Sequence, residues 1–137
     1  MPFDPVRVED TRAWLERARQ DMGAGRADLA ADPSYPGDAM FHAQQAAEKA
    51  LKGFLAWHEV IFRKTHDLRE LFGNCSRIDP SLRELGEQAE SLTPYAWRFR
   101  YPGERDEPTS EEAEEALALA REVYDAILAR LPEEVRS

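Results

Sequence analysis

The residue types best suited to acid–base chemistry and to anion binding are concentrated between Phe41 and Leu68. All three lysines and all three histidines of the chain lie there: Lys49, Lys52, Lys64, His42, His58 and His66. The chain as a whole is acidic, with a formal net charge of −9. A local group of ammonium and imidazole groups on such a background predicts a binding place for an anionic ligand, with phosphate as the simplest example.

Residues from Asp38 to Trp57 or Val60 follow helical spacing, with Asp38 as the expected N-cap. Spacing of about 100° per residue places the polar side chains on one side of this helix: Gln44, Gln45, Glu48, Lys49 and Lys52. One interpretation is a solvated face with an i,i+4 ion pair between Glu48 and Lys52. The other is a cationic ledge in which Lys49 and Lys52 bind phosphate while Gln45 orients the ligand.

Two further segments supply candidate ligand contacts. His66 either bonds the backbone or Asp67 at a helix start, or acts as an acid, a base or a phosphate contact. Residues 98–102 interleave guanidinium groups and rings, which suits stacking on a base and contacting a phosphate through Arg98, Arg100 and Tyr101. An equally physical alternative is that the rings anchor this connector to the core while the arginines pair with nearby glutamates.

Metal chemistry is not predicted from the spacing of the ligand-type residues. Cys75 is the only cysteine, so neither an intrachain disulfide nor a cysteine-based zinc site can form. The three histidines lack the close spacing of a metal site, and His42 lies beside the apolar side of its helix, where it suits packing or an interface. The sequence therefore predicts no metal and no cofactor.

The elements that must position these residues are all helical. The spacing predicts long helices over residues 11–31, 38–57 or 60, 82–92 and 110–131, and a short one from Thr65 that stops at Gly73-Asn74. Thr109 and Glu112 have the spacing of a capping box at the start of the last helix. No segment alternates as a strand does. We expect an all-α, antiparallel up-and-down bundle of four long helices plus one short helix, with the alanine-rich second helix at its centre.

Composition limits the class of protein. A chain of 137 residues with 42% hydrophobic and 33% charged residues is expected to form one globular domain over residues 1–137, with its core at about 11–131. The net negative charge argues against broad, sequence-independent wrapping of nucleic acid. The N-terminus has no basic or apolar leader, and no window approaches the roughly 18 apolar residues that a membrane helix needs. These features predict a cytoplasmic protein with no membrane association.

Three motifs in order resemble the HEPN domain family of prokaryotes: FHAQQAAEKALK (41–52), KTHDL (64–68) and RYP (100–102). The resemblance extends over roughly residues 11–131. It implies an all-α bundle that is usually a homodimer. It also implies a minimal nucleotidyltransferase as partner, in a two-component, toxin–antitoxin-like pair. Other members of the family are ribonucleases that act at the dimer interface, and that branch carries an arginine followed after four to six residues by a histidine.

This chain departs from the ribonuclease pattern. Arg63 precedes His66 by only three residues, and no histidine follows Arg98 or Arg100. The favoured hypothesis is therefore a dimeric nucleotide- or RNA-binding module that works with a nucleotidyltransferase. The first alternative is a divergent, metal-independent ribonuclease that uses His66 with Arg63 or Arg100. The second is a pure protein-interaction module.

Overall fold

A computed structural model describes residues 3–98, 102 and 107–136. These residues form α-helices and two 3-10 helices, and none of them is in a strand. The bounds in chain order are α1 (Pro5–Ala30), α2 (Pro36–Trp57), α3 (Leu68–Ile78), η1 (Pro80–Leu82), α4 (Arg83–Ala89), η2 (Glu90–Ala96), α5 (Ser110–Leu128) and α6 (Glu133–Arg136). The all-α class predicted from the sequence is confirmed.

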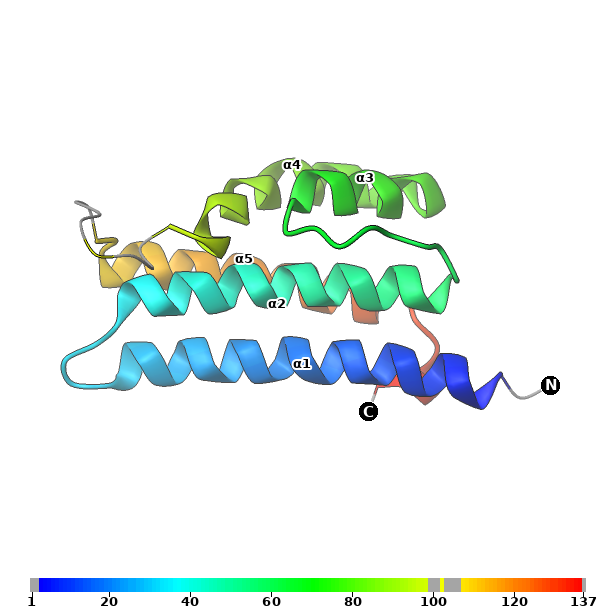
Figure 1. Cartoon of the computed structure of the whole chain (residues 1–137), viewed down its shortest axis with the longest axis horizontal. Coiled ribbons are helices and arrows are strands. Elements are labelled where there is room, and N and C mark those ends of the chain that lie inside the picture. The colour runs from blue at the N-terminus through cyan, green and yellow to red at the C-terminus, as the bar shows by residue number, and fades with distance from the viewer. Residues whose placement is uncertain (1–2, 99–101, 103–106, 137) are drawn as a thin grey trace.

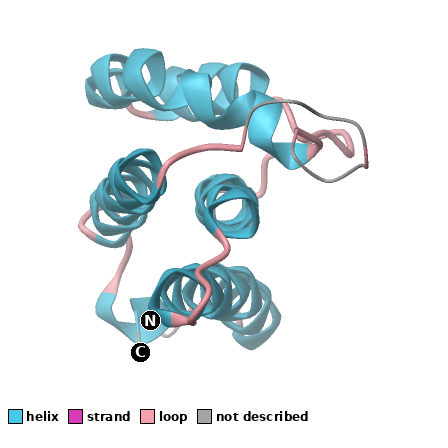
Figure 2. Ribbon diagram, turned by 90° about the vertical axis from the view of Figure 1, so that its left-hand side faces the viewer, coloured by secondary structure: helices cyan, strands magenta, loops and turns pink. Residues whose placement is uncertain are grey.

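The helices pack in three layers. α1 lies on one side, α2 and α5 lie beside each other in the middle, and α3 with α4 covers the other side (Figures 1 and 2). α2 contacts α1, α3, α5 and η2 and is therefore the central helix, as predicted. Its alanine positions 39, 43, 46, 47 and 50 are fully buried, so neighbouring helices approach its backbone closely.

Helix direction departs from a simple up-and-down order. The start of α5 pairs with the end of α1, through Arg26 and Glu114, so these two helices are antiparallel. The starts of α2 and α5 are neighbours, because Met40 and Glu112 line the same hollow. α2 and α5 therefore run parallel (Figure 1). The segment 58–67 makes this possible, because it returns along α2 before α3 begins.

Several predicted boundaries are wrong. The short third helix does not stop at Gly73-Asn74 but continues to Ile78, since its buried positions Leu71, Phe72 and Cys75 keep it packed through this point. Its N-cap is Asp67, whose carboxylate accepts a hydrogen bond from the backbone N–H of Arg69, and not Thr65. α2 begins at Pro36 rather than after Asp38, because proline suits the first helical turn.

The predicted count of four long helices and one short helix also changes. α1, α2 and α5 are long, with 26, 22 and 19 residues. The predicted fourth long helix is instead the series η1, α4 and η2, in which α4 has only seven residues and Pro94 lies inside η2. The short α6 follows Pro132.

The start of α5 is as expected. The Thr109 hydroxyl accepts a hydrogen bond from the backbone N–H of Glu112, and the Glu112 carboxylate accepts one from the backbone N–H of Thr109, both at 3.0 Å. This is the predicted capping box. Within the residues that the structure describes, no helix combines the length and apolar character needed to cross a membrane.

Candidate functional site

The polar side of α2 is buried, although the sequence suggested a solvated face. Gln44, Gln45, Glu48 and Lys52 are at most 8% exposed, and Lys49 is only partly exposed. The segment 58–67 contacts this side through His66, which lies against Gln44 and Glu48, and α1 contacts it through Asp21, which pairs with Lys49. The interpretation as a solvated face is therefore wrong, while its ion pair between Glu48 and Lys52 is present at 3.0 Å.

One group of side chains is centred on the buried carboxylate of Glu48. It accepts hydrogen bonds from the Gln44 amide at 3.1 Å and from the Lys52 ammonium at 3.0 Å, and its Oε1 lies 2.7 Å from His66 Nδ1. The Gln45 amide donates to Gln44 at 2.6 Å. We call Gln44, Gln45, Glu48, Lys52 and His66 the Glu48 cluster. Hydrogen bonds to each of its buried polar groups offset the cost of removing them from water.

Lys52 is held on more than one side. Its ammonium lies 5.7 Å from the ring centroid of Trp14 and 5.9 Å from that of Phe62, in addition to its contact with Glu48. Trp14 belongs to α1, and Phe62 belongs to the segment that returns along α2. Lys52 therefore joins three parts of the fold through cation–π contacts and an ion pair.

His66 is the exposed member of the Glu48 cluster. Its side chain is 64% exposed, whereas that of Glu48 is 4% exposed. Because Nδ1 faces the Glu48 carboxylate, the ring is oriented with Nε2 away from that contact. The backbone carbonyl of His66 also accepts a hydrogen bond from Gln44 at 3.1 Å, which fixes this part of the chain against α2. A carboxylate-oriented imidazole at a surface can bind an anion or transfer a proton.

Lys49 does not join the Glu48 cluster. Its ammonium contacts Asp21 of α1 at 2.6 Å. Asp21 also contacts His42 Nδ1 at 2.9 Å, and His42 Nε2 faces Asp28 and Asp38. We call Asp21, Asp28, Asp38, His42 and Lys49 the His42 cluster. The two lysines proposed as a ledge thus belong to separate groups, each paired with a carboxylate.

Electrostatics in the His42 cluster follow from the crowding of carboxylates. The hydrogen bond to Asp21 raises the pKa of His42 against the opposing effect of burial. Burial acts to raise the pKa of Asp21, but hydrogen bonds from His42 and Lys49 outweigh it, and the pKa is lowered. Burial and the neighbouring Asp38 raise the pKa of Asp28 to about 6.

The predicted contact segment at residues 98–102 lies only in part within the described residues. Arg98 follows η2 and is exposed, and its backbone N–H donates to Pro94 at 2.9 Å. η2 approaches the Glu48 cluster, because the Thr93 hydroxyl accepts a hydrogen bond from the backbone N–H of Leu68, two residues beyond His66. Arg100 and Tyr101 lie outside the described residues. Arg63, the alternative partner of His66, forms an ion pair with Glu70 at 2.8 Å.

The Glu48 cluster joins Gln45, Lys52 and His66 of the predicted site, and the network also contains Gln44 and Glu48. The helical spacing predicts these two residues on the polar side of the helix but gives them no role as ligand contacts. The His42 cluster is not predicted from the sequence, because Asp21 and Asp28 lie in a helix that supplies no candidate residue. The i,i+4 spacing of Asp38 and His42 was the available signal. Neither cluster lines the hollow of about 720 Å³ that lies between α3 and α4, whose lining includes Arg69, Arg77 and Glu87.

Known proteins are similar to this chain over most of its length. The model of the HEPN domain matches residues 11–131. The protein "Putative toxin MJ1304" of Methanocaldococcus jannaschii is 32% identical, over 88% of this chain and 87% of that protein.

Two solved structures share the fold. The crystal structure of TT1696 from Thermus thermophilus is 30% identical with a TM-score of 0.75, covering 88% of this chain and 98% of that one. ST0689, an archaeal HEPN homologue, is 22% identical with a TM-score of 0.70, covering 88% of this chain and 96% of that one. The family match covers most of the chain and agrees with the three ordered motifs. The chain belongs to the HEPN domain family.

Proposed function

We propose that this protein is the HEPN component of a toxin–antitoxin-like pair and that it binds a nucleotide or RNA at the surface beside the Glu48 cluster. The observation that carries the proposal is the pairing of an exposed imidazole, His66, with a buried carboxylate, Glu48. An anionic ligand there meets an imidazole of fixed orientation, whose Nε2 donates when the ring is protonated, rather than a flexible side chain. The description of the relative from M. jannaschii as a putative toxin supports the toxin-like role.

Further contacts are proposed from the neighbouring segments. Arg98, Arg100 and Tyr101 follow η2, whose Thr93 lies against the start of α3 close to His66. Phosphate contact by the arginines and stacking by Tyr101 would extend the ligand surface. Lys49, Lys52 and Gln45 act less directly, because each is already hydrogen-bonded to a side chain of the protein. We propose that Lys52 and Gln45 hold the Glu48 cluster in place.

A second candidate function is ribonuclease activity without a metal. The geometry of His66 favours it, since a carboxylate that accepts from Nδ1 fixes the orientation and the tautomer of the imidazole. His66 would then exchange a proton with a ribose hydroxyl or with the leaving oxygen. Arg63 and Arg100 remain the candidates for contact with the phosphate.

The experiment that tests both functions compares the unaltered protein with His66→Ala in binding and cleavage of total RNA and transfer RNA. We expect RNA or nucleotide binding to weaken at least tenfold, or by about 1.4 kcal/mol, in His66→Ala. His58→Ala is the matched control, because His58 lies outside the Glu48 cluster at the end of α2. Cleavage lost only in His66→Ala supports the ribonuclease. Equal binding by all three proteins contradicts the proposed site.

The proposed assembly is a homodimer that associates with a minimal nucleotidyltransferase. Light scattering on the purified chain measures the first part. Co-purification with the product of an adjacent reading frame, followed by a growth assay with and without that product, measures the second. A monomeric chain that slows growth and is not relieved by the neighbouring product contradicts this arrangement.

A further inference from the structure

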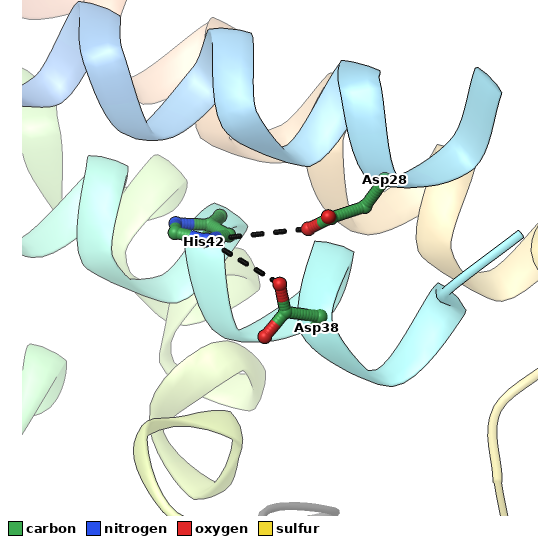
Figure 3. Close-up of side chains that lie close together, drawn as sticks. All are labelled: Asp28, Asp38 and His42. Carbon is green, nitrogen blue, oxygen red and sulfur yellow. Dashed lines mark ion pairs between the residues drawn. The ribbon is translucent and has the colours of Figure 1, made fainter. Parts of the chain in front are cut away.

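Three ligand-type atoms from two helices converge at one end of the α1–α2 pair. Figure 3 shows Asp28 on α1 facing His42 and Asp38 on α2. His42 Nε2 lies 3.6 Å from Asp38 Oδ2 and 4.0 Å from Asp28 Oδ2. One donor atom from each of the three residues lies within 4.8 Å of the others. These separations exceed those of normal hydrogen bonds, so the group is not held by direct bonds from Nε2.

The direction of the imidazole is set from its other side. Nδ1 of His42 lies 2.9 Å from Asp21 Oδ1, and the other oxygen of Asp21 accepts a bond from Lys49 at 2.6 Å. With its proton on Nδ1, the neutral ring directs the lone pair of Nε2 at Asp28 and Asp38. A carboxylate that holds the far nitrogen of a histidine is the usual support for a metal-binding imidazole.

A carboxylate oxygen in the same place has no hydrogen-bond partner. Asp28 Oδ2 is buried and accepts no hydrogen bond. It lies 4.0 Å from His42 Nε2, and Figure 3 shows the Asp38 carboxylate on the same side of the ring. A buried carboxylate oxygen left in this way is costly, and a cation bound between the three donors would satisfy it.

The spacing suits a small divalent cation. Zinc bonds to nitrogen and oxygen of about 2.0–2.2 Å in a tetrahedral site put neighbouring donors about 3.4 Å apart. The separations of 3.6 and 4.0 Å from His42 Nε2 therefore need only a slight inward movement, and the donor oxygens of the two carboxylates lie within 4.8 Å of each other. Asp38 can supply it, because its side chain is 50% exposed, whereas those of Asp28 and His42 are 20% and 22% exposed.

The donor set and its access to solvent limit the choice of ion. Imidazole nitrogen favours transition cations, and carboxylate oxygen accommodates manganese as well as zinc, whereas Ca²⁺ and Mg²⁺ prefer oxygen alone. Asp38 also lines an open hollow of about 510 Å³, next to Pro36 and Glu107. Asp28 and His42 do not line this hollow, so we expect an ion to enter from the side of Asp38 and water to complete its coordination there.

We propose that Asp28, Asp38 and His42 bind one divalent transition cation, of the Zn²⁺ or Mn²⁺ type, which links α1 to α2. Asp21 is the positioning residue that holds the imidazole, and Lys49 holds Asp21. The competing arrangement is a protonated His42 that interacts with the three carboxylates and takes the place of the cation. The proposal concerns this end of the α1–α2 pair and is independent of ligand binding at His66.

The test uses full-length protein that has been stripped with EDTA and dialysed. Zn²⁺, Mn²⁺, Co²⁺, Mg²⁺ and Ca²⁺ are titrated separately by calorimetry, and the thermal midpoint is measured with each. We expect one Zn²⁺ or Mn²⁺ per chain, a raised midpoint and little response to Mg²⁺ or Ca²⁺. Bound Co²⁺ should give a visible absorption band with nitrogen ligation.

Three variants decide the outcome. Asp38→Asn alters the exposed ligand and should weaken binding at least about tenfold. His42→Gln should remove the nitrogen signature of the Co²⁺ complex. Asp125→Asn is the matched control, since Asp125 pairs with Arg121 on the exposed side of α5 and should leave metal binding unchanged.

Failure of the unaltered protein to bind any of these ions saturably overturns the proposal in favour of the protonated histidine. Equal affinity in Asp38→Asn also overturns it, by showing that the ions bind elsewhere. If His42→Gln does not fold, Asp38→Asn still decides between the two arrangements. RNA binding measured on Asp38→Asn is expected to match that of the unaltered protein, which separates this result from the test of His66.

Discussion

Glu48 connects the interior of the protein to its surface through three side chains. Its carboxylate contacts Gln44 and Lys52 on the same helix and His66 on a separate segment, while only 4% of the Glu48 side chain is exposed. Ionised groups in such a place are tolerated only when they are paired and hydrogen-bonded. Removal of one partner should therefore cost more than the pair as a whole contributes.

A double-mutant cycle on Glu48 and Lys52 tests this. Lys52→Met should destabilise the fold by about 3–5 kcal/mol, because it leaves a buried carboxylate without its ammonium partner. Glu48→Gln should also destabilise the fold, whereas the double variant should cost clearly less than the sum of the two. Urea unfolding of the four proteins measures the coupling. Additive losses would contradict the interpretation of Glu48 and Lys52 as one buried unit.

At the scale of residues, the sequence predicted which side of a helix a residue lies on better than it predicted what that residue contacts. The phase of α2 correctly separated its alanines from Gln44, Glu48 and Lys52. The burial of that polar side could not be read from the phase, because it depends on a segment that returns along α2 from outside the helix. The contact of Lys49 with Asp21 could not be predicted for a similar reason, since it depends on how α1 packs against α2.

Two glycines show how packing between elements outweighs local preference. Gly73 suggested a helix stop, yet it lies inside α3, and a methyl group there would meet no atom within 4 Å. Gly86 lies in α4, where a methyl group would come within 2.9 Å of the Phe72 ring. The first glycine is a local weakness in α3, and the second allows α4 to approach α3 closely.

The matched variants Gly73→Ala and Gly86→Ala should therefore have opposite effects. Gly73→Ala should stabilise the fold by about 0.5–1 kcal/mol, because alanine loses less backbone entropy in a helix. Gly86→Ala should destabilise it by about 1–3 kcal/mol through overpacking against Phe72. Thermal or urea unfolding measures both. A loss of stability in Gly73→Ala would mean that the glycine is needed for the course of α3.

The clearest predictions of elements were those with complete local signals. The capping box at Thr109 predicted the start of α5, and the helical spacing of apolar residues predicted the existence of α1, α2 and α5. The prediction of one long helix within residues 80–96 was wrong, because short 3-10 helices have no periodicity long enough to recognise in a sequence. η1 packs against α3, and η2 packs against α2 and α3, and these contacts are not visible in the sequence.

At the scale of the whole molecule, Asp79 joins two distant helices. It follows α3, and its carboxylate accepts hydrogen bonds from Ser81 and from Arg130, which lies just beyond α5. Hydrogen bonds from the Ser81 hydroxyl and backbone, together with Arg130, lower the pKa of Asp79. In the unfolded chain this carboxyl group regains an ordinary pKa and binds a proton more readily.

The stability that Asp79 contributes should therefore be present above pH about 4 and lost as the pH falls through its lowered pKa in the folded state. Asp79→Asn should flatten the acidic part of the curve of unfolding free energy against pH. Arg130→Gln should flatten it less, because the hydrogen bonds from Ser81 remain. Urea midpoints across the acidic range measure the slopes. Curves for both variants that parallel the unaltered protein would contradict this assignment.

The parallel pairing of α2 and α5 has a consequence for synthesis on the ribosome. α1 and α2 are joined by a short connection and can meet as soon as both have emerged, whereas α5 follows only after residues 58–109 have been made. Until then, the apolar surface of α2 that α5 covers has no partner. We expect nascent chains that end before Ser110 to be bound by chaperones or to aggregate, and pelleting of ribosome-released fragments of increasing length would show where that hazard ends.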